Sequence, residues 1–296
     1  MHVDQVDVTT GTVESLIREQ FPRWSGEAIR RVPSTGTVNA IFRIGDALSA
    51  RFPLRPADPA EALAVLQREA LASAELARVS PFPAPEPVAL GEPGAGYPMP
   101  WSVQTWLPGT VASDADPSGS DAFAEDLAAF VAALRDAGTR GRVFDGDNRG
   151  GVLTHHDAWM ATCFARSEAL LDVPRLRRLW SHLRELPRTS PDVMSHRDLI
   201  PGNVLVAGDR LGGVLDTGGF GPADPALDLV GAWHLLRTGP REVLRRALGC
   251  DDLEWERGRA WAFEQAMGLV WYYVESNPEM SALGRRTLDR LLGSTQ

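Results

Sequence analysis

One short run of the sequence limits the possible folds and chemistries more than any other feature. It reads Ser195-His196-Arg197-Asp198-Leu199-Ile200-Pro201-Gly202-Asn203, and the apolar strand that comes after it ends at Asp216. In an H-R-D-x-x-x-x-N loop, the carboxylate lies beside an incoming hydroxyl and the amide oxygen beside a magnesium ion, while an acid after the next hairpin completes the metal site. The spacing therefore predicts a phosphoryl-transfer site built from Asp198, Asn203 and Asp216.

The three residues have distinct predicted roles. Asp198 is the candidate catalytic carboxylate, which would orient the acceptor hydroxyl and take its proton, a role worth roughly 10²–10⁴ in rate for a positioned base. Asn203 and Asp216 offer the hard oxygen ligands that Mg²⁺ prefers, and the ion would bridge phosphate oxygens. Taken singly, Asp198 is an ordinary loop acid and Asp216 a cap before a glycine turn, but their joint spacing favours the catalytic interpretation.

Length and composition are those of a globular protein. The 296 residues suffice for one large domain or for two lobes with separate cores, and we expect two lobes. Hydrophobic residues make up 44% of the chain, and no apolar run approaches the roughly 18 residues of a membrane helix. No secretory signal is evident, so we expect a cytoplasmic protein without a membrane partner. Two cysteines, Cys163 and Cys250, are too few for a disulfide framework or a zinc site.

The charge pattern narrows the partners and the site chemistry. The net charge of -9 argues against nucleic acid as a partner. All 30 residues counted as lysine or arginine are arginine. A site that usually contains a lysine must therefore use arginine here or do without it.

The first hundred residues predict a small sheet and a long helix. Strands at 40–44 and 47–52 flank a Gly45-Asp46 turn, and side-chain alternation predicts that Arg51 points away from the apolar row of its strand. Asp58 as N-cap and Pro59 at the first helical position predict a helix to about Val79. The proline-rich stretch at 81–87 predicts an extended connector, and residues 97–107 have the composition of a strand.

The rest of the chain is predicted to be mostly helical. Apolar faces and cap signals, such as Ser120 at a start or Gly249 at an end, predict helices near 120–138, 174–186, 240–249, 252–275 and 281–292. Strands at 204–206 and 214–215, joined by a turn, are predicted to flank the signature. We expect a nucleotide-binding lobe at 1–107 and a helical lobe, with the catalytic and acceptor sites, at 108–296.

Two further residues are predicted to hold the catalytic loop. Asp228 lies near the start of a helix that Asp224 and Pro225 open, close enough to bind backbone amides of the loop, although a capping role alone fits equally well. His196 is predicted to fix the loop through its ring rather than to transfer protons.

The first lobe also holds candidate nucleotide contacts. The stretch Ser34 to Asn39, which includes Gly36 and Thr37, could cover phosphates with backbone amides, although a plain hairpin turn would look the same. Arg51 on a strand and Glu69 on the following helix have the layout of a phosphate-anchoring cation and its carboxylate partner. Taken alone, they are a surface ion pair.

Further short runs accompany the signature in both lobes. They are Gly36-Thr37-Val38-Asn39, Phe42-Arg43-Ile44-Gly45-Asp46, Arg51-Phe52-Pro53, Tyr97-Pro98-Met99-Pro100-Trp101, Trp106-Leu107-Pro108-Gly109, Asp224-Pro225-Ala226-Leu227-Asp228-Leu229 and Arg257-Gly258-Arg259-Ala260-Trp261. With these runs, nearly the whole chain resembles the aminoglycoside phosphotransferase family, which is built on a protein-kinase-like fold.

This resemblance implies an architecture and a reaction. The fold would be α+β and bilobal, with an N-terminal antiparallel sheet plus helix and a mostly helical C-terminal lobe. The enzyme would use ATP or GTP with Mg²⁺ and bind the base through hinge backbone around Gln104 to Trp106. The expected acceptor is a hydroxyl of a small molecule, most favourably an aminoglycoside-type antibiotic, with a macrolide or another small alcohol as the alternative.

The sequence departs from the family pattern in three places. The kinase-type lysine is replaced by Arg51, a bidentate fork in place of a point charge. Arg197 stands where the family commonly has glycine, and Thr217-Gly218 follows Asp216 where relatives usually carry an aromatic residue or isoleucine. None of these changes removes a catalytic atom, so activity is expected.

Two other functions compete with this interpretation. His155, His156 and Asp157, together with His196 and Asp198, could be ligands of a metal-dependent phosphohydrolase, but adjacent histidines point in different directions on a helix or hairpin. A catalytically silent kinase-like protein that binds nucleotide or an antibiotic is the other alternative, and the missing lysine leaves it open.

The acceptor-binding residues are less defined. Acidic residues of the second lobe could line a cleft for an amine-rich sugar, but a solvated helix face is the more common role for most of them. Late aromatic residues could stack on a sugar or a macrolactone, although core packing is favoured. The acidic residues are Asp157, Asp251, Asp252, Glu254, Glu264 and Glu275. The aromatic residues are Trp255, Trp261, Trp271, Tyr272 and Tyr273.

Overall fold

The computed structural model describes residues 6–33, 38–146 and 148–293. The chain divides into two compact units, which we call the N-terminal unit and the C-terminal unit. The N-terminal unit comprises Met1–Arg78, Pro83–Pro108 and Asp216–Gly218, and the C-terminal unit comprises Val79–Phe82, Gly109–Leu215 and Gly219–Gln296. A short segment that starts at Asp216 thus belongs to the N-terminal unit, although its neighbours in sequence belong to the other.

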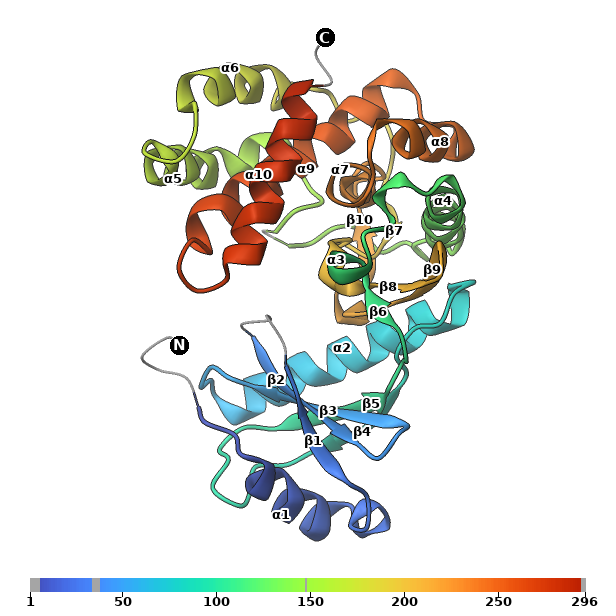
Figure 1. Cartoon of the computed structure of the whole chain (residues 1–296), viewed down its shortest axis with the longest axis vertical. Coiled ribbons are helices and arrows are strands. Elements are labelled where there is room, and N and C mark those ends of the chain that lie inside the picture. The colour runs from blue at the N-terminus through green and yellow to red at the C-terminus, as the bar shows by residue number, and fades with distance from the viewer. Residues whose placement is uncertain (1–5, 34–37, 147, 294–296) are drawn as a thin grey trace. The chain divides into compact units, whose positions relative to one another are not determined.

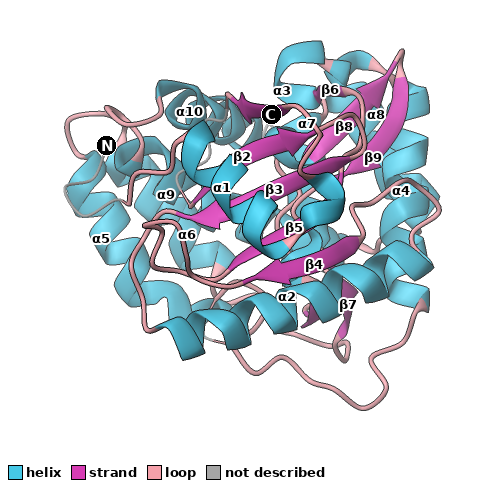
Figure 2. Cartoon of the chain, turned by 90° about the horizontal axis from the view of Figure 1, so that it is seen from below, coloured by secondary structure: helices cyan, strands magenta, loops and turns pink. Residues whose placement is uncertain are grey.

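The N-terminal unit is built on a five-stranded antiparallel sheet with the order β1-β2-β3-β5-β4 (Figures 1 and 2). Its strands are β1 (Ile29–Val32), β2 (Asn39–Ile44), β3 (Leu48–Pro53), β4 (Pro87–Gly91) and β5 (Trp101–Thr105). Its helices are α1 (Thr10–Gln20) and α2 (Pro59–Val79). The α+β fold class, with an N-terminal antiparallel sheet, is confirmed.

The predicted hairpin and helix are present. Strands β2 and β3 pair around Gly45, whose φ of 56° lies in the left-handed region that glycine adopts without a steric penalty. Helix α2 starts at Pro59, and the Asp58 carboxylate accepts from the backbone N–H groups of Ala60 and Glu61. These bonds confirm the helix start that the sequence predicted.

Strand β4 was missed. It begins at Pro87, the last residue of the stretch expected to be an extended connector, continues to Gly91, where no element was predicted, and is an edge strand of the sheet. Proline is tolerated as the first residue of an edge strand because its missing N–H is not needed there. The neighbouring strand β5 is shorter than predicted, since it covers only Trp101–Thr105 of the expected 97–107.

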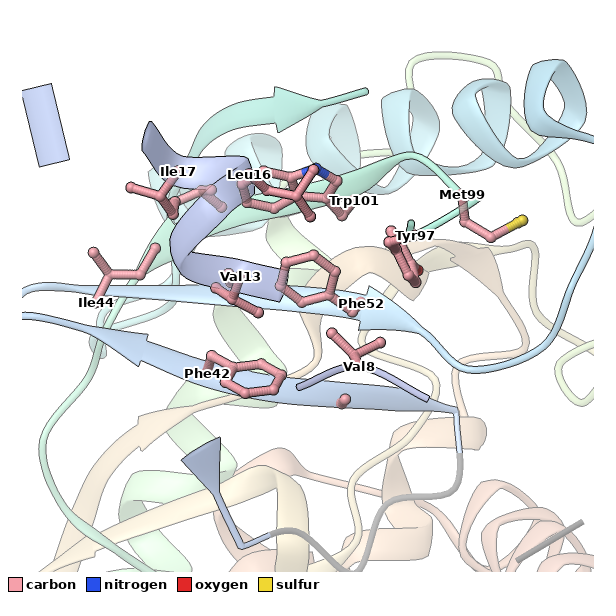
Figure 3. Close-up of a cluster of buried hydrophobic side chains, with 13 residues drawn as sticks. Val8, Val13, Leu16, Ile17, Phe42, Ile44, Phe52, Tyr97, Met99 and Trp101 are labelled. Atoms are coloured by element: carbon pink, nitrogen blue, oxygen red, sulfur yellow. The ribbon is translucent and has the colours of Figure 1, made fainter. Parts of the chain in front are cut away.

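The core of the N-terminal unit lies between the sheet and α1 (Figure 3). Phe52 stacks on Trp101 with ring centroids 4.8 Å apart, and Leu16 and Ile17 of α1 are buried in the same cluster. The alternation along β3 therefore has the predicted consequence: Phe52 faces this core and Arg51 faces away from it.

The C-terminal unit is mostly helical, as predicted, with two small sheets (Figure 1). Its helices are α3 (Ala112–Ala115), α4 (Asp121–Asp136), α5 (Asp157–Ser167), α6 (Val173–Leu183), α7 (Val230–Leu235), α8 (Thr238–Leu248), α9 (Asp252–Tyr272) and α10 (Pro278–Gly293). Its strands are β6 (Thr110–Val111), β7 (Val193–Ser195), β8 (Val204–Ala207), β9 (Arg210–Val214) and β10 (Gly221–Ala223), paired as β6-β8-β9 and β10-β7.

Helix α9 is the centre of this unit. Nearly every residue from Trp255 to Val270 is buried, and α5, α6, α7 and α10 pack against the helix. Trp261 is fully buried and donates from Nε1 to Asp224 at 2.9 Å, while Arg257 pairs with the same carboxylate. Core packing of Trp255 and Trp261 is thus confirmed.

Local signals set several helix ends in this unit. Ser120 caps α4 by accepting from the N–H of Phe123 at 3.0 Å, and Gly249 ends α8 with a φ of 65°. Helices α3 and α5 and strands β6, β7 and β10 were not predicted.

Among the helices of residues 6–33, 38–146 and 148–293, none has an apolar stretch of the length that crossing a membrane requires.

Candidate active site

The Asp198 carboxylate accepts hydrogen bonds from three side chains. Asn203 donates from Nδ2 to Oδ2 at 2.9 Å. Gln265 and Arg149 donate to Oδ1 at 2.8 and 3.2 Å. The Asp198 side chain still keeps 36% of its surface exposed. The carboxylate is therefore held in one orientation while solvent, or a substrate, can reach it.

The backbone of the catalytic loop is fixed by Asp228. Its carboxylate accepts from the N–H groups of His196 at 2.8 Å and Arg197 at 2.9 Å, and the residue is buried. A buried carboxylate requires such donors, and here they come from the loop itself. The predicted contact between Asp228 and the loop amides is confirmed.

His196 has the structural role that the sequence predicted. Its Nδ1 accepts from the N–H of Asp198 at 3.3 Å, so the ring proton lies on Nε2, which donates to the carbonyl of Leu215 at 2.9 Å. The N–H of Leu215 in turn donates to the carbonyl of Asn203 at 2.8 Å. The residue directly before Asp216 in the sequence is thus tied to the catalytic loop by two hydrogen bonds.

The orientation of the Asn203 amide suits a metal ligand. Its Nδ2 donates both to the Asp198 carbonyl at 3.0 Å and to the Asp198 carboxylate. A flipped amide would set its oxygen against these two acceptors, so Oδ1 must be the atom on the other side. An amide oxygen is a hard donor of the type that Mg²⁺ prefers, and Asn203 fits the predicted role.

Arg197 adopts a backbone conformation that favours glycine. Its φ is 75°, in the left-handed region, which costs a non-glycine residue on the order of 1 kcal/mol. The guanidinium lies over the ring of Phe144 at 5.4 Å and donates to the carbonyl of Pro222. Burial lowers the pKa of Arg197, and the nearby carboxylate of Asp145 opposes that shift. The side-chain contacts offset part of the backbone strain.

A pocket of about 230 Å³ lies within the N-terminal unit, between α2 and the strands β4 and β5. Arg51 reaches it because it points to the face of the sheet opposite the hydrophobic core. The lining residues are Arg51, Leu66, Glu69, Ala70, Ser73, Pro87, Val88, Ala89, Leu90, Ser102, Val103, Gln104 and Gly218.

Arg51 pairs with Asp216 beside this pocket. The guanidinium donates to Oδ1 of Asp216 at 2.8 Å, and the two side chains are 19% and 48% exposed. Asp216 has a φ of 55°, so its backbone is left-handed like that of Arg197. The predicted cation is therefore present on the pocket wall and holds the predicted metal ligand.

Glu69 adds a third charge to this group. Loss of hydration raises the pKa of its carboxyl, the Arg51 charge lowers it, and the Asp216 charge raises it further. A Cβ on Gly218 would meet the Glu69 side chain at 2.9 Å, so this position fits only glycine without a shift. The ion-pair partner of Arg51 is thus Asp216 rather than the predicted Glu69, which acts on Arg51 and Asp216 through its nearby charge.

Two backbone N–H groups at the expected hinge are already used. Gln104 lines the pocket, but the N–H of Thr105 donates to Glu86 at 2.9 Å and that of Trp106 donates to Ala47 at 2.7 Å. From Thr105 and Trp106, only carbonyl oxygens or side chains are left for a base. Of the other expected nucleotide contacts, Gly36 and Thr37 lie outside the described residues.

The site residues are divided between the two units. Asp198 and Asn203 belong to the C-terminal unit, and Arg51, Glu69 and Asp216 to the N-terminal unit. The chain passes from one unit to the other at the peptide bond before Asp216. The sharing of one Mg²⁺ by Asn203 and Asp216 stays a prediction.

The residues of the alternative metal site have other partners. His156 shares a hydrogen bond with Glu264 at 3.0 Å, and Asp157 pairs with Arg184. Within the described part of the chain, no group of three or more His, Cys, Asp or Glu side chains is arranged to hold a metal ion. This arrangement gives no support to a phosphohydrolase.

Two contacts of Asp198 were not predicted from the sequence. Arg149 comes from a loop, and Gln265 from the middle of α9. The available signal was the pair Glu264-Gln265 in the otherwise apolar stretch from Ala260 to Leu269. Buried polar residues in such a stretch need partners, but the sequence does not name them.

Comparison with known proteins places this chain among phosphotransferases. The family model described as the phosphotransferase enzyme family (APH) matches residues 29–261. No curated protein sequence gives a significant match.

Solved structures match over nearly the whole chain. A GDP complex of a variant of aminoglycoside 2'-phosphotransferase-IIIa has a TM-score of 0.71 at 18% identity, covering 97% of this chain and 98% of that one. The streptomycin–ATP ternary complex of APH(2'')-IIa has a TM-score of 0.61 at 15% identity, covering 94% and 95%. Macrolide 2'-phosphotransferase MphH from Brachybacterium faecium has a TM-score of 0.61 at 19% identity, covering 93% and 97%. At these identities, the matches establish the fold.

Proposed function

Because the chain belongs to the phosphotransferase enzyme family (APH), we propose that it transfers the γ-phosphate of ATP or GTP to a hydroxyl of an aminoglycoside-type antibiotic. The observation that carries this proposal is the Asp198 carboxylate, which three donors orient while 36% of its side chain stays exposed. A general base must be both positioned and reachable, and Asp198 meets both conditions.

Each site residue has a role in this proposal. Asp198 accepts a hydrogen bond from the acceptor hydroxyl and takes its proton as the phosphoryl group is transferred. The amide oxygen of Asn203 and the carboxylate of Asp216 bind Mg²⁺. Arg51 binds nucleotide phosphates, with Glu69 as its electrostatic partner.

Bound Mg²⁺ would neutralise negative charge on the phosphates during transfer. Arg51 brings a second positive charge, in the form of a planar fork that matches two phosphate oxygens. It already pairs with Asp216 at 2.8 Å, which supports a nucleotide and a metal held by one charged group. An arginine can therefore take the place of the usual lysine.

The acceptor class has a second candidate. Solved structures of similar fold include aminoglycoside and macrolide phosphotransferases. One observation favours a macrolide: Trp159 and Tyr272, each 39% exposed, are linked by ring contacts through Trp271 at the end of α9. Exposed rings of this kind suit an apolar acceptor.

Three of the acidic residues that could select an amine-rich sugar, all near the start of α9, are engaged in other contacts. Glu254 pairs with Arg135, Asp252 pairs with Arg245, and Asp251 caps α9. These contacts are structural, so they neither require nor forbid an aminoglycoside.

A substrate screen tests the proposal directly. The purified chain is mixed with Mg²⁺ and either ATP or GTP, and with a panel of aminoglycosides, macrolides and simple amino alcohols. We expect acceptor-dependent release of the nucleoside diphosphate and a phosphorylated product by mass spectrometry. Asp198→Asn serves as the matched control, because it removes the base while keeping the size of the side chain. Nucleotide binding without transfer to any acceptor would instead establish the silent binding protein.

A further inference from the structure

We propose that Gln265 is a positioning residue for Asp198 and the last member of a hydrogen-bond relay that begins at Thr287 and passes through His234. This inference rests on the proposed function, because it concerns the carboxylate to which we assign the base role. It adds residues of α7, α9 and α10 to the catalytic machinery, although none of them carries a sequence motif.

The relay is continuous and buried. Oγ1 of Thr287 lies 2.9 Å from Nδ1 of His234, and Nε2 of His234 lies 3.1 Å from Oε1 of Gln265. Nε2 of Gln265 then donates to Oδ1 of Asp198 at 2.8 Å. The first three residues are 0%, 3% and 5% exposed, while Asp198 reaches solvent. The relay thus connects the interior of the unit to the reachable carboxylate.

Every bond in the relay has the same direction. Gln265 must turn its N–H toward the carboxylate, which leaves its oxygen toward His234. An amide oxygen only accepts, so the proton of the His234 ring lies on Nε2, and Nδ1 must accept from the Thr287 hydroxyl. Each donor therefore points along the relay toward Asp198.

His234 is in the neutral form that this direction requires. Its pKa is lowered to about 3, chiefly by burial; the hydrogen bond with Gln265 opposes this shift, and the charges of Arg149 and Arg290 contribute to it. A protonated ring would carry a hydrogen on Nδ1 and could not accept from Thr287. At neutral pH, the ring is uncharged and the relay is complete.

The relay can affect the rate of transfer because it orients the Asp198 carboxylate, whose two oxygens accept from different donors. Oδ1 accepts from Gln265 and Arg149, and Oδ2 accepts from Asn203. Aligned donors polarise one another in a low-dielectric interior, which strengthens the last bond. Fixing Oδ1 fixes the lone pairs that remain for the acceptor hydroxyl. A base displaced by about 1 Å loses roughly 10²-fold in rate.

The alternative is that these residues only join three helices. In that case, variants would lose stability without a specific effect on turnover. Ser281 offers a matched control, because its hydroxyl donates to the carbonyl of Val270 at 2.7 Å and also joins α10 to α9. Its bond is buried but does not lead to Asp198.

The experiment compares four variants under conditions where the wild type is active. Gln265→Glu keeps the shape and an oxygen toward His234 but loses the donor to Asp198, and Gln265→Leu removes the donor without adding charge. We expect kcat to fall roughly 10- to 100-fold in both, with the KM values of nucleotide and acceptor within about twofold of wild type. Thr287→Val should lower kcat by about two- to fivefold. Ser281→Ala should leave kcat unchanged.

Two results would overturn the relay. One is full kcat in both Gln265 variants while Asp198→Asn is inactive. The other is an equal loss of kcat in Ser281→Ala and Thr287→Val, which would show that helix joining alone matters.

A readout without turnover separates this proposal from the proposed function. Nitrogen NMR of the His234 ring should show the proton on Nε2 and a ring that stays neutral from pH 7 to pH 5, because its pKa is about 3. A proton on Nδ1 would refute the relay even if the enzyme is active. If the wild type transfers no phosphate while the Nε2 proton is present, the base role of Asp198 fails and the hydrogen-bond chain stands.

Discussion

Asp198 and Asp216 are both carboxylates of the predicted site, yet they are held in different ways. The Asp198 carboxylate accepts hydrogen bonds from three side chains. One of them, Gln265, is itself hydrogen-bonded to the buried residue His234. Asp216 pairs with Arg51, and its side chain is 48% exposed. A base must have a fixed orientation before the acceptor arrives, whereas a metal ligand must be able to exchange a partner for an ion. The two surroundings match these two needs.

The difference extends to the kind of energy that holds each group. Asp198 depends chiefly on two amide donors, Asn203 and Gln265, and Gln265 continues into a low-dielectric interior that solvent ions screen little, while the partly exposed contact with Arg149 is a third, weaker support. Asp216 depends on an ion pair near the surface, where Coulomb energy is modest and falls with salt. The comparison therefore predicts distinct responses to mutation, pH and ionic strength.

The largest expected effect is the loss of the base. Asp198→Asn should lower kcat by roughly 10²–10⁴-fold, because the proton of the acceptor hydroxyl then has no positioned acceptor. Nucleotide affinity, measured by calorimetry with Mg²⁺, should stay within about twofold of wild type, since Arg51 and Asp216 are untouched. A variant with wild-type turnover would remove the distinction between the two carboxylates.

The next effect concerns the metal ligand. Asp216→Asn should weaken Mg²⁺-dependent nucleotide binding by at least the roughly 10- to 100-fold that is typical of losing a residue that supports a metal ligand. Binding of nucleotide measured with EDTA should change much less. Glu69→Gln is the matched control, because it also removes a carboxylate from this charged group but not a proposed ligand. Equal Mg²⁺ dependence in wild type and Asp216→Asn would contradict the assignment.

The sequence predicted those parts of the site whose residues lie close together in the chain, and it missed the contacts that join distant helices. The signature residues lie within a short run or one hairpin of each other, and the Arg51 orientation follows from strand alternation, so local rules were sufficient. The bonds of the relay join residues 67, 31 and 53 positions apart. Such contacts arise from the packing of whole helices, which no local spacing encodes. Strand β4 was missed for another reason, because a proline at its start is more typical of a connector.

A third effect tests the buried support of Asp198 through pH. The pKa of His234 is about 3 in the folded protein, below its ordinary value of 6.5, so between these values the unfolded state binds more protons. The free energy of unfolding should therefore fall as pH falls from 6.5, with this residue contributing up to about 1.4 kcal/mol per pH unit. His234→Gln should flatten that slope in urea unfolding between pH 6 and pH 5.

The exposed histidine His155 provides the control for this measurement. His155→Gln removes a titratable ring of the same unit without touching the relay, and the slope should stay closer to that of wild type. An unchanged slope in His234→Gln would mean that the ring is not held neutral in the folded protein.

The smallest expected effect concerns Arg51, which pairs with the partly exposed Asp216. Arg51→Lys keeps the charge but replaces a planar fork by a point charge, so we expect the KM of nucleotide to rise about two- to fivefold with kcat nearly unchanged. The shift in thermal stability should be small, because an ion pair in which Asp216 is 48% exposed contributes at most about 1 kcal/mol.

Ionic strength is the decisive variable for this last prediction. A Debye length of about 8 Å at physiological salt screens surface charges but not a buried ring. Raising salt should therefore weaken nucleotide binding in wild type and in Arg51→Lys, yet leave the acid-dependent stability set by His234 in place. If salt altered both properties equally, Asp198 and Asp216 would be held by the same kind of interaction, and the contrast between them would fail.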